Sequence, residues 1–374
     1  MATRSVKAPR GNISRREVLR RGALTLGLLG LAGPVPELLA ACADDRVVPG
    51  HRELDVRSFG ADPSGATKST TALQAALDRV RANGGGTVYL PAGTYLVDLA
   101  RHPLDARYAC ALVVGRNTLM KGAGRDATRI LLAGSQAQGN DVSGRTMIVL
   151  NHDIIAQRDE NIALAELTVD GNAPDQNHTH SGVGLIRSRG AHLERVRVTN
   201  CRGTASSGPN ETFHFETQLG TDTSYVDCEA VGTSGSTASG FSADGAHNVQ
   251  YVGCVAHGMS VTNGFTHYSC QNVTYRGCVS YANAASGFNS EVSQDVSYSD
   301  CTAGGTIGNS VGFLAKGSSP VQWASCVASA NGVGLYITQA PAGADQRLIG
   351  GDYSRNGQSI VFGDAQSAAS LHIS

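Results

Sequence analysis

The sequence is poor in charge. Only 16% of its 374 residues are Asp, Glu, Lys or Arg, against about 25% in ordinary soluble domains, and aromatic residues make up only 5%. Glycine is abundant instead, with 46 residues. This balance disfavours a helical bundle, which glycine destabilises, and favours an all-β chain with many tight turns. The apolar share of 41% is enough for a core, which excludes wholesale disorder.

Excess positive charge is confined to the start of the chain. Residues 1–41 hold seven Lys and Arg against two acids, which leaves 23 basic and 29 acidic residues in the remainder. The remainder of the chain therefore lacks the excess of positive charge with which proteins bind nucleic acid. We therefore expect no nucleic-acid partner.

The basic N-terminus has the pattern of an export signal. Ser14-Arg15-Arg16-Glu17-Val18-Leu19 precedes an apolar run from Gly22 to Gly33, which is too short for a membrane span of about 20 residues. A charged region followed by a short apolar region is typical of a signal peptide. The paired arginines resemble the twin-arginine export signal, and Leu39-Ala40-Ala41-Cys42 resembles a lipoprotein cleavage box.

We therefore assign residues 1–41 to a twin-arginine-type lipoprotein signal peptide and residues 42–52 to a linker. Cleavage would leave Cys42 as an acylated N-terminus. The mature protein would then be an exported lipoprotein, anchored by its lipid at the cell surface or in the periplasm, with no other contact to the membrane. The alternative is a plain signal peptide cut near Ala41, with Cys42 unmodified.

From Leu193 onward one unit recurs every 23–27 residues. It begins with an apolar residue, an aromatic residue and a cysteine at fixed spacing, as in Val249, Tyr251 and Cys254. A variable loop then leads to a second strand, which begins Gly-Phe in four units: Gly240-Phe241, Gly264-Phe265, Gly287-Phe288 and Gly312-Phe313. A short period with alternating strands and no helical pattern predicts a β-solenoid, in which each coil needs its neighbours to bury its apolar face.

Six of the nine cysteines occupy one position of this repeat: Cys201, Cys228, Cys254, Cys278, Cys301 and Cys326. Cysteines of exported proteins commonly pair. Here the stacking of coils at about 4.8 Å makes the six a ladder of small core residues, and a disulfide across stacked strands would be strained. We expect reduced, buried thiols.

Residues 69–83 precede the repeats with an amphipathic helical pattern. The residues on its apolar face are Leu73, Ala76, Leu77 and Val80. Ser69 or Thr70 can serve as N-cap, and Gly84-Gly85-Gly86 ends the pattern. A helix there would cover the open end of the solenoid and its edge strand.

This region resembles the opening of the pectate-lyase-like right-handed parallel β-helix superfamily. The resemblance rests on Val56-Arg57-Ser58-Phe59-Gly60-Ala61-Asp62, on the helix, and on Gly85-Gly86-Thr87-Val88-Tyr89-Leu90-Pro91-Ala92-Gly93-Thr94-Tyr95. It implies an all-β fold, a right-handed parallel β-helix over 53–374 with an N-terminal capping α-helix at about 69–83. Lyases, hydrolases, epimerases and phage spikes share this opening. The order of segments most resembles the catalytic module of secreted mannuronan C5-epimerases, which act on alginate.

The Gly-Phe strands can be aligned with each other. With the Phe as position zero and pointing inward, positions one and three point outward, because side chains alternate along a strand. If Phe213 is taken as an earlier copy of that Phe, position three holds Glu216, Asp244, Tyr268, Glu291 and Lys316, and position one holds His214 and Asn289 among others. His267, at position two, is expected to be a satisfied core residue.

We interpret this outer row as the active face, walled by the loops at 202–211 and 229–239. The expected catalytic residues are His214, Glu216, Asp244 and Tyr268, and the expected substrate-binding residues are Asn289, Glu291, Lys316 and Arg187, which follows an earlier strand. The alternative is an ordinary solvated face, since exposed strand positions are polar anyway. Against it, stacked acids repel each other and cost stability, which is tolerated more readily where function requires it.

Three functions fit a polysaccharide on this face. The first is proton abstraction beside a uronate carboxylate, as in lyases and epimerases. It needs an acid, a base and a cation that neutralises the substrate carboxylate. The cation could be Lys316, Arg187 or a calcium ion held by the acids. Glycoside hydrolysis needs two carboxylates, such as Glu216 with Asp244, or Asp244 with Glu291. The third function is binding without catalysis. No cofactor is required, although calcium would fit.

The epimerase resemblance implies a catalytic role for Asp244, because Gly240-Phe241-Ser242-Ala243-Asp244 is similar to the family's Gly-Phe-Val-Ala-Asp. The preceding strand departs from the family: His214-Phe215-Glu216 stands in place of Asp-Pro-His-Glu, and Glu211 in place of an upstream tyrosine. Tyr268 could supply the phenol. The acidic body repels an anionic polymer, which favours a hydrolase, but we place lyase or epimerase chemistry first.

The export signal is directly testable. Replacing Arg15 and Arg16 with Lys is expected to block export through the pathway for folded proteins, and Cys42→Ala is expected to abolish labelling by a fatty-acid analogue. Both are measured by fractionating cells that express the full chain. A Cys42→Ala protein that still partitions into the membrane would contradict the lipid anchor.

Overall fold

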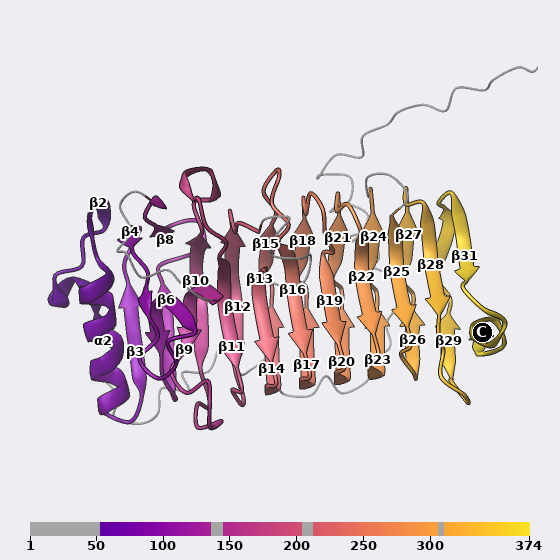
Figure 1. Cartoon of the computed structure of the whole chain (residues 1–374), viewed down its shortest axis with the longest axis horizontal. Helices are drawn as coiled ribbons and strands as arrows, with labels where there is room; N and C mark the ends of the chain where they lie inside the picture. Colours follow the sequence, from indigo (N-terminus) through magenta and orange to yellow (C-terminus); the bar gives the residue numbers. More distant parts are fainter. Residues whose placement is uncertain (1–52, 136–144, 204–211, 306–309) are drawn as a thin grey trace, which may run out of the picture. The chain divides into compact units, whose positions relative to one another are not determined.

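The computed structural model describes residues 53–135, 145–203, 212–305 and 310–374. The predicted signal peptide, linker and Cys42 lie outside these ranges, as do Glu211 and most of the 202–211 loop. From residue 53 the chain forms a right-handed parallel β-helix, as predicted, in which successive coils stack along the chain (Figure 1). Among the described residues, no helix is long and apolar enough to cross a membrane.

One strand of each coil belongs to an 11-stranded sheet, which we call sheet B. Neighbouring strands within this sheet are parallel, except for the first pair, which is antiparallel. Its strands are β5 (Ala100–Arg101), β6 (Tyr108–Val114), β9 (Arg145–Asn151), β11 (Ser181–Ile186), β13 (Phe213–Gln218), β16 (Ser239–Asp244), β19 (Phe265–Tyr268), β22 (Ser286–Glu291), β25 (Val311–Lys316), β28 (Val333–Thr338) and β31 (Gln358–Phe362).

The other strands form a 21-stranded sheet, sheet A, in two columns. The first column holds β1 (Leu54–Asp55), β3 (Gly86–Leu90), β7 (Thr118–Gly122), β14 (Thr221–Val226), β17 (His247–Val252), β20 (Gln271–Arg276), β23 (Gln294–Ser299), β26 (Val321–Ala324), β29 (Gln346–Ile349) and β32 (Leu371–Ile373). The second holds β2 (Ser64–Lys68), β4 (Gly93–Val97), β8 (Thr128–Leu132), β15 (Glu229–Val231), β18 (Val255–His257), β21 (Val279–Tyr281), β24 (Thr302–Gly304), β27 (Val327–Ser329) and β30 (Asp352–Arg355). Strands β10 (Ala163–Asp170) and β12 (His192–Thr199) run through both columns.

The repeat pattern predicts two strands in each coil, and the structure adds a third. The additional strand follows the cysteine directly, as β18 follows Cys254. It is only three residues long in most coils, which is too short for an alternating pattern to be recognised in the sequence.

Two aromatic stacks fill the core. The rings of Phe215, Phe241, Phe265, Phe288 and Phe313 lie parallel with centroids 4.6–4.9 Å apart. A second stack, formed by Tyr225, Tyr251, Tyr275 and Tyr298, has spacings of 4.7–5.0 Å. The two stacks meet edge to face at 5.6–5.8 Å. Such contacts contribute about 0.5–1.5 kcal/mol each beyond burial, so they fix how each coil lies on the next.

The cysteine ladder is buried and unpaired, as predicted. All eight described cysteines are free and buried. Within the ladder, thiols donate to carbonyl oxygens of the preceding coil, as Cys254 does to Tyr225 and Cys278 to Tyr251, both at 3.4 Å. The cysteines therefore act as small core residues, and five of the six also donate to a backbone carbonyl.

The capping helix α2 spans Thr70–Ala82 and buries the four predicted apolar residues. Ser69 is its N-cap residue, as predicted, although its side chain makes no hydrogen bond to the first turn of the helix. The hydroxyl of Ser69 accepts from the backbone N–H of Asp62 at 2.9 Å, and the hydroxyl of Thr70 donates to Asp98 at 2.5 Å. These tertiary partners compete with the helix for the hydroxyls and attach its first turn to the underlying coils. The described residues also contain two 3-10 turns, η3 (Val56–Phe59) and η5 (Ala173–Asp175), and the short helix α3 (Ala365–Ala369).

A left-handed residue follows each strand of sheet B from β11 to β28. These residues have φ between 49° and 65°, and we call them the corner column: Arg187, Leu219, Gly245, Ser269, Val292, Gly317 and Gln339. The backbone turns away from sheet B at this position in every one of these coils. The corner column therefore borders the end of the outer face.

His267 points into the core, as predicted. Its Nδ1 lies 3.0 Å from the hydroxyl of Tyr275 and its Nε2 lies 2.8 Å from that of Ser290. Burial lowers the pKa of His267 from 6.5 to about 3. The imidazole is therefore a neutral part of the core, with both ring nitrogens bonded.

Buried histidine makes the stability depend on pH. His267 takes up a proton near pH 6.5 in the unfolded chain and only near pH 3 in the folded chain. Between these pH values unfolding therefore binds a proton, and the unfolding free energy falls as the pH drops. Removing this imidazole by His267→Gln should reduce the loss of unfolding free energy between pH 7.5 and 5 by about 2 kcal/mol, measured by urea denaturation. The exposed His247→Gln variant controls for loss of an imidazole as such, and equal losses in wild type and His267→Gln would contradict the assignment.

Candidate functional site

Strand β13 lies two residues out of the predicted alignment. Phe215, and not Phe213, pairs with Phe241, and their rings stack at 4.6 Å. A shift of two residues preserves the alternation of the strand, so Glu216 stays on the outer side. It moves from position three to position one, opposite Ser242, and Gln218 takes its place opposite Asp244.

His214 is a second correction. The prediction that it faces outward is wrong, because its fully buried side chain interacts with the backbone of Val231 in β15 of sheet A. It occupies the position that is glycine in neighbouring coils, where a Cβ on Gly240 would stand 2.2 Å from the carbonyl oxygen of Gly264. The backbone there turns the residue into the coil. Nδ1 of His214 donates to the carbonyl of Ser239 at 2.8 Å, and burial lowers the pKa of His214 to about 4.

The remainder of the third-position row is as predicted. Consecutive strands pair Asp244 with Tyr268, Tyr268 with Glu291, and Glu291 with Lys316. With Gln218 at the start, these five residues form what we call the polar row. Adjacent members are about 4.8 Å apart, so the row extends for about 20 Å along the outer face of sheet B, in its β13–β25 part (Figure 1).

The first part of the row is a connected network. Arg145, at the start of β9, forms an ion pair with Glu216 and donates to the Gln218 side-chain oxygen at 3.2 Å. The Gln218 amide in turn donates to the Asp244 carboxylate at 3.4 Å. A cation from two coils upstream is thus linked through one amide to a half-buried carboxylate.

Glu216 has unusual electrostatics for an outer-face residue. Its side chain is 1% exposed, and one carboxylate oxygen has no hydrogen-bond partner. Burial raises the pKa of Glu216, Arg145 opposes the rise, and Asp244 adds to it. The carboxyl group therefore keeps its proton to higher pH than an ordinary glutamate. This is the property of a general acid.

Tyr268 stands in the middle of the row and is 53% exposed. Beyond it lies a second connected group. Asn289, at position one, donates its amide to Glu291 at 2.9 Å and to Thr266 at 3.3 Å, and Lys316 forms an ion pair with Glu291 at 3.3 Å. The row thus has a cation near each end, with the phenol and Asp244 between them.

Arg187 is not part of the row. It belongs to the corner column, and its guanidinium donates to the carbonyl of Ile155 at 3.3 Å. The guanidinium is thus directed toward a neighbouring loop, and the expected part of Arg187 in substrate binding stays a prediction.

An apolar cluster closes the upstream side of the row. Its buried members are Cys110, Met147, Leu150, Ile154 and Ile186. Ile186 pairs with Gln218 in the next strand, so the outer face of sheet B changes from apolar to polar between β11 and β13.

Sequence reasoning missed Arg145 and Gln218. Nothing near Arg145 in the sequence indicates that its side chain reaches a strand two coils away. Gln218 was hidden by the two-residue misalignment, which an alternating pattern cannot detect. The Phe215–Phe241 stack decides the alignment, because the next four coils continue it with Phe241, Phe265, Phe288 and Phe313 at the same position.

The corrected alignment changes the comparison with the epimerase motif. After Phe215 the chain reads Glu216-Thr217-Gln218-Leu219 where the family has Asp-Pro-His-Glu, so an amide occupies the place of the imidazole. Phe213 moves to the position of the upstream tyrosine. Tyr268 is then the phenol beside Asp244.

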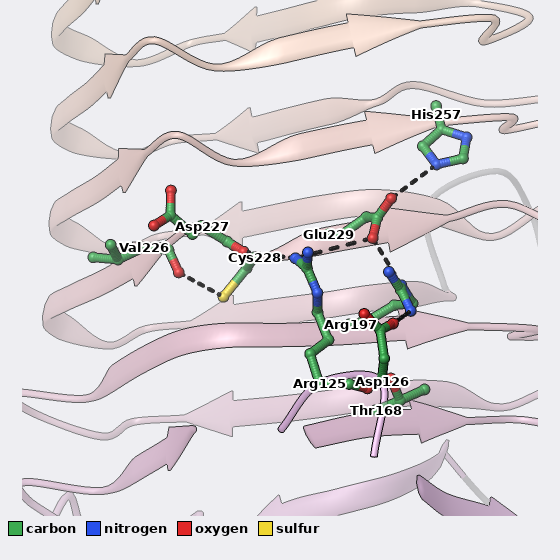
Figure 2. A network of polar contacts seen from close by, with 9 residues as sticks. All are labelled: Arg125, Asp126, Thr168, Arg197, Val226, Asp227, Cys228, Glu229 and His257. Carbon is green, nitrogen blue, oxygen red and sulfur yellow. Dashed lines mark hydrogen bonds and ion pairs between the residues drawn. The ribbon is translucent and has the colours of Figure 1, made fainter. Parts of the chain in front are cut away.

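A second polar network lies on sheet A (Figure 2). Glu229 accepts from Arg197 at 2.7 Å and lies 3.4 Å from His257 and 4.0 Å from Arg125. The bond to His257 and the arginines lower the pKa of Glu229 to about 2. Because these charges are matched to one another and connect the loop carrying Arg125 to three stacked coils, we regard the network as structural.

Calcium has no evident ligand cage in the described part of the chain. No group of three or more His, Cys, Asp or Glu side chains there is arranged to hold a metal ion. Asp244 and Glu291 are separated by Tyr268 in the row, and Glu216 is held by Arg145.

The Arg145–Glu216 pair can be tested by a double-mutant cycle. Arg145→Met should lower the unfolding free energy by about 3 kcal/mol, because it leaves a buried carboxylate without its cation. Adding Glu216→Gln to that variant should restore most of the loss, as measured by urea denaturation. Arg347→Met, which breaks an exposed pair with Asp345, is the matched control and should change little. Strictly additive effects of the two substitutions would contradict the coupling.

Comparison with known proteins supports the fold and identifies relatives. Mannuronan C5-epimerase AlgE3 of Azotobacter vinelandii is 37% identical over 170 residues, which is 44% of this chain and 9% of that protein. Alginate lyase 7 of the same organism is 33% identical over 120 residues, which is 32% of this chain and 13% of that protein. The chain thus spans a small part of the length of these relatives.

Solved structures share the architecture. The A-module of mannuronan C-5 epimerase AlgE4 from Azotobacter vinelandii has a TM-score of 0.59 at 20% identity, covering 86% of this chain and 97% of that one. The surface adhesin PfbA of Streptococcus pneumoniae has a TM-score of 0.53 at 12% identity, covering 86% of this chain and 90% of that one. At these identities the likeness concerns the fold alone.

The family model of rhamnogalacturonase A/epimerase, pectate lyase-like, matches residues 54–307, which includes the strands that carry the polar row up to Glu291. On this match, the chain belongs to the rhamnogalacturonase A/epimerase, pectate lyase-like family.

Proposed function

We propose that this protein is a polysaccharide-modifying enzyme that acts on a uronate-containing glycan by lyase or C5-epimerase-type proton abstraction on the outer face of sheet B. The observation that carries the proposal is the polar row, in which a half-buried carboxylate and an exposed phenol stand on adjacent strands. Relatives named as mannuronan C5-epimerases and an alginate lyase support the substrate class.

The residues of the row can divide the chemistry. The Asp244 carboxylate would take the proton from the carbon next to the uronate carboxylate, and the Tyr268 phenol would donate a proton. Lys316, which is 42% exposed and has one ion-pair partner among the described residues, would neutralise the uronate carboxylate so that the enolate-like intermediate forms more readily. Return of a proton to the opposite face gives epimerisation, and loss of the neighbouring glycosidic oxygen gives lysis.

The amide at Gln218 separates this site from the epimerase motif. An amide cannot exchange protons at neutral pH as an imidazole does. We therefore assign both proton transfers to Asp244 and Tyr268, which distinguishes the proposed mechanism from that of the family motif. The hydrogen bond from Gln218 to Asp244 would orient the carboxylate.

Glycoside hydrolysis is the second candidate, and the environment of Glu216 favours it. Two carboxylates whose surroundings separate their pKa values are the mark of an acid and base pair. Glu216 is buried with a raised pKa, and Asp244 is half-buried on the next strand, two positions further along. This diagonal spacing of about 8 Å is within the roughly 6.5–9.5 Å of inverting glycosidases.

A product assay distinguishes the candidates. The mature protein is incubated with mannuronan, other polyuronates and neutral glucans while absorbance near 235 nm and reducing ends are followed. A rise in both indicates a lyase, and reducing ends alone indicate a hydrolase. Solvent deuterium uptake without either indicates an epimerase. Binding without any of these signals would contradict the proposed enzyme and indicate a binding protein.

Substitutions test the roles on the substrate so identified. Under proton abstraction, Tyr268→Phe should lower kcat by about 10²–10⁴-fold with little change in binding, because the fold and the other contacts are kept. Under hydrolysis, Tyr268→Phe should be mild, while Glu216→Gln and Asp244→Asn should each nearly abolish turnover. Tyr336→Phe, which removes another phenol at position one of β28, is the matched control. Near wild-type activity in all three site variants would place the site elsewhere.

We also propose export with a lipid anchor at Cys42. The twin-arginine pattern and the cleavage box support it, and a surface location would bring the enzyme to extracellular polysaccharide. Calcium is not required by the proposed mechanism, in which Lys316 supplies the positive charge.

A further inference from the structure

The corner column carries two large apolar side chains beside the polar row. Leu219 follows Gln218 and is 41% exposed, and Val292 follows Glu291 and is 52% exposed. Neither belongs to a hydrophobic core cluster. Their half-exposed side chains therefore contribute little to the stability of the fold, and core packing does not account for them.

The backbone makes these residue types costly at the corner. Leu219 has φ of 52° and Val292 has φ of 49°. In this left-handed region a β-branched residue such as valine is a genuine outlier, whereas glycine adopts it freely. Gly245 and Gly317 fill the same position in other coils, so the fold accepts glycine at this corner. The cost of leucine and valine has to be offset by some other benefit.

Both side chains lean along the solenoid over a glycine of the next coil. A Cβ on Gly245 would stand 2.7 Å from a methyl carbon of Leu219, and one on Gly317 would stand 3.6 Å from a methyl carbon of Val292. Leu219 therefore lies beside Asp244, which precedes Gly245, and Val292 lies beside Lys316, which precedes Gly317. The exposed ring of Tyr268 stands between them in the row.

We propose that Leu219, Tyr268 and Val292 form an apolar shelf that receives the C–H faces of successive sugar rings and so positions the polysaccharide over Asp244. Leu219 and Val292 are three strands apart, about 14 Å, which is the length of a short oligosaccharide. The polar row then meets the hydroxyl and carboxylate groups of the chain while the shelf meets its apolar faces. This inference rests on the proposed function and adds the residues that determine substrate position.

Glycine substitutions separate binding from folding. Leu219→Gly and Val292→Gly remove the apolar contact and also relieve the left-handed strain. Each should leave the thermal midpoint unchanged or higher, while KM and Kd for mannuronate oligosaccharides rise about fivefold with a smaller effect on kcat. Ala330→Gly is the matched control, because Ala330 is an exposed left-handed residue (φ 59°) that follows β27 of sheet A. It should leave KM unchanged.

The possible outcomes are distinct. If wild type turns over mannuronan and both glycine variants keep its KM and Kd, the shelf is wrong while the proposed function stands. Glycine variants that lose stability would also overturn the shelf, because they would assign these side chains to folding. If wild type neither binds nor converts mannuronan or any other polyuronate of the product assay, the proposed function fails, and the shelf fails with it.

Discussion

Parallel hydrogen bonding between consecutive coils places each position of the repeat directly over the same position of the previous coil. Side chains of one position therefore stack at the spacing of the strands, about 4.8 Å. Inside, this favours residues that pack well on copies of themselves, which are the Phe and Tyr rings and the ladder of cysteine thiols. Outside, the same constraint converts single residues of separate repeats into the polar row. The site is thus a product of the stacking that holds the core together.

Stacking also sets the electrostatic problem that the outer face has to solve. Acids in neighbouring coils would repel each other, and the structure separates them. Glu216 is displaced to position one and held by Arg145, Tyr268 stands between Asp244 and Glu291, and Lys316 pairs with Glu291. Each acid therefore has either a basic partner or an uncharged neighbour, although the surface as a whole is not neutral. Because Arg145 is paired with Glu216 and Lys316 with Glu291, only Asp244 carries an uncompensated charge, so the row repels an anionic sugar chain less than its three acids alone would.

Local patterns predicted the features that depend only on neighbours in sequence. The capping helix, the cysteine ladder and the inward direction of His267 follow from periodicity and residue type. The misplacement of β13 has a physical cause, because a shift of two residues leaves every side chain on the same face of the sheet. Only the stacking of Phe215 on Phe241 decides between the predicted and the observed alignment. Long-range contacts such as the reach of Arg145 across two coils leave no trace in the local sequence. The sequence therefore predicted the face that carries the polar row, while Arg145 and Gln218 in its network were missed.

The central claim is that the substrate lies along the polar row of sheet B. A crystal structure of the Asp244→Asn variant with a mannuronate oligosaccharide tests it most directly. The account predicts sugar rings along strands β13 to β25, with one carboxylate near Lys316 and the reacting ring between residue 244 and Tyr268. An oligosaccharide bound to sheet A, or along the upstream apolar cluster, would contradict it.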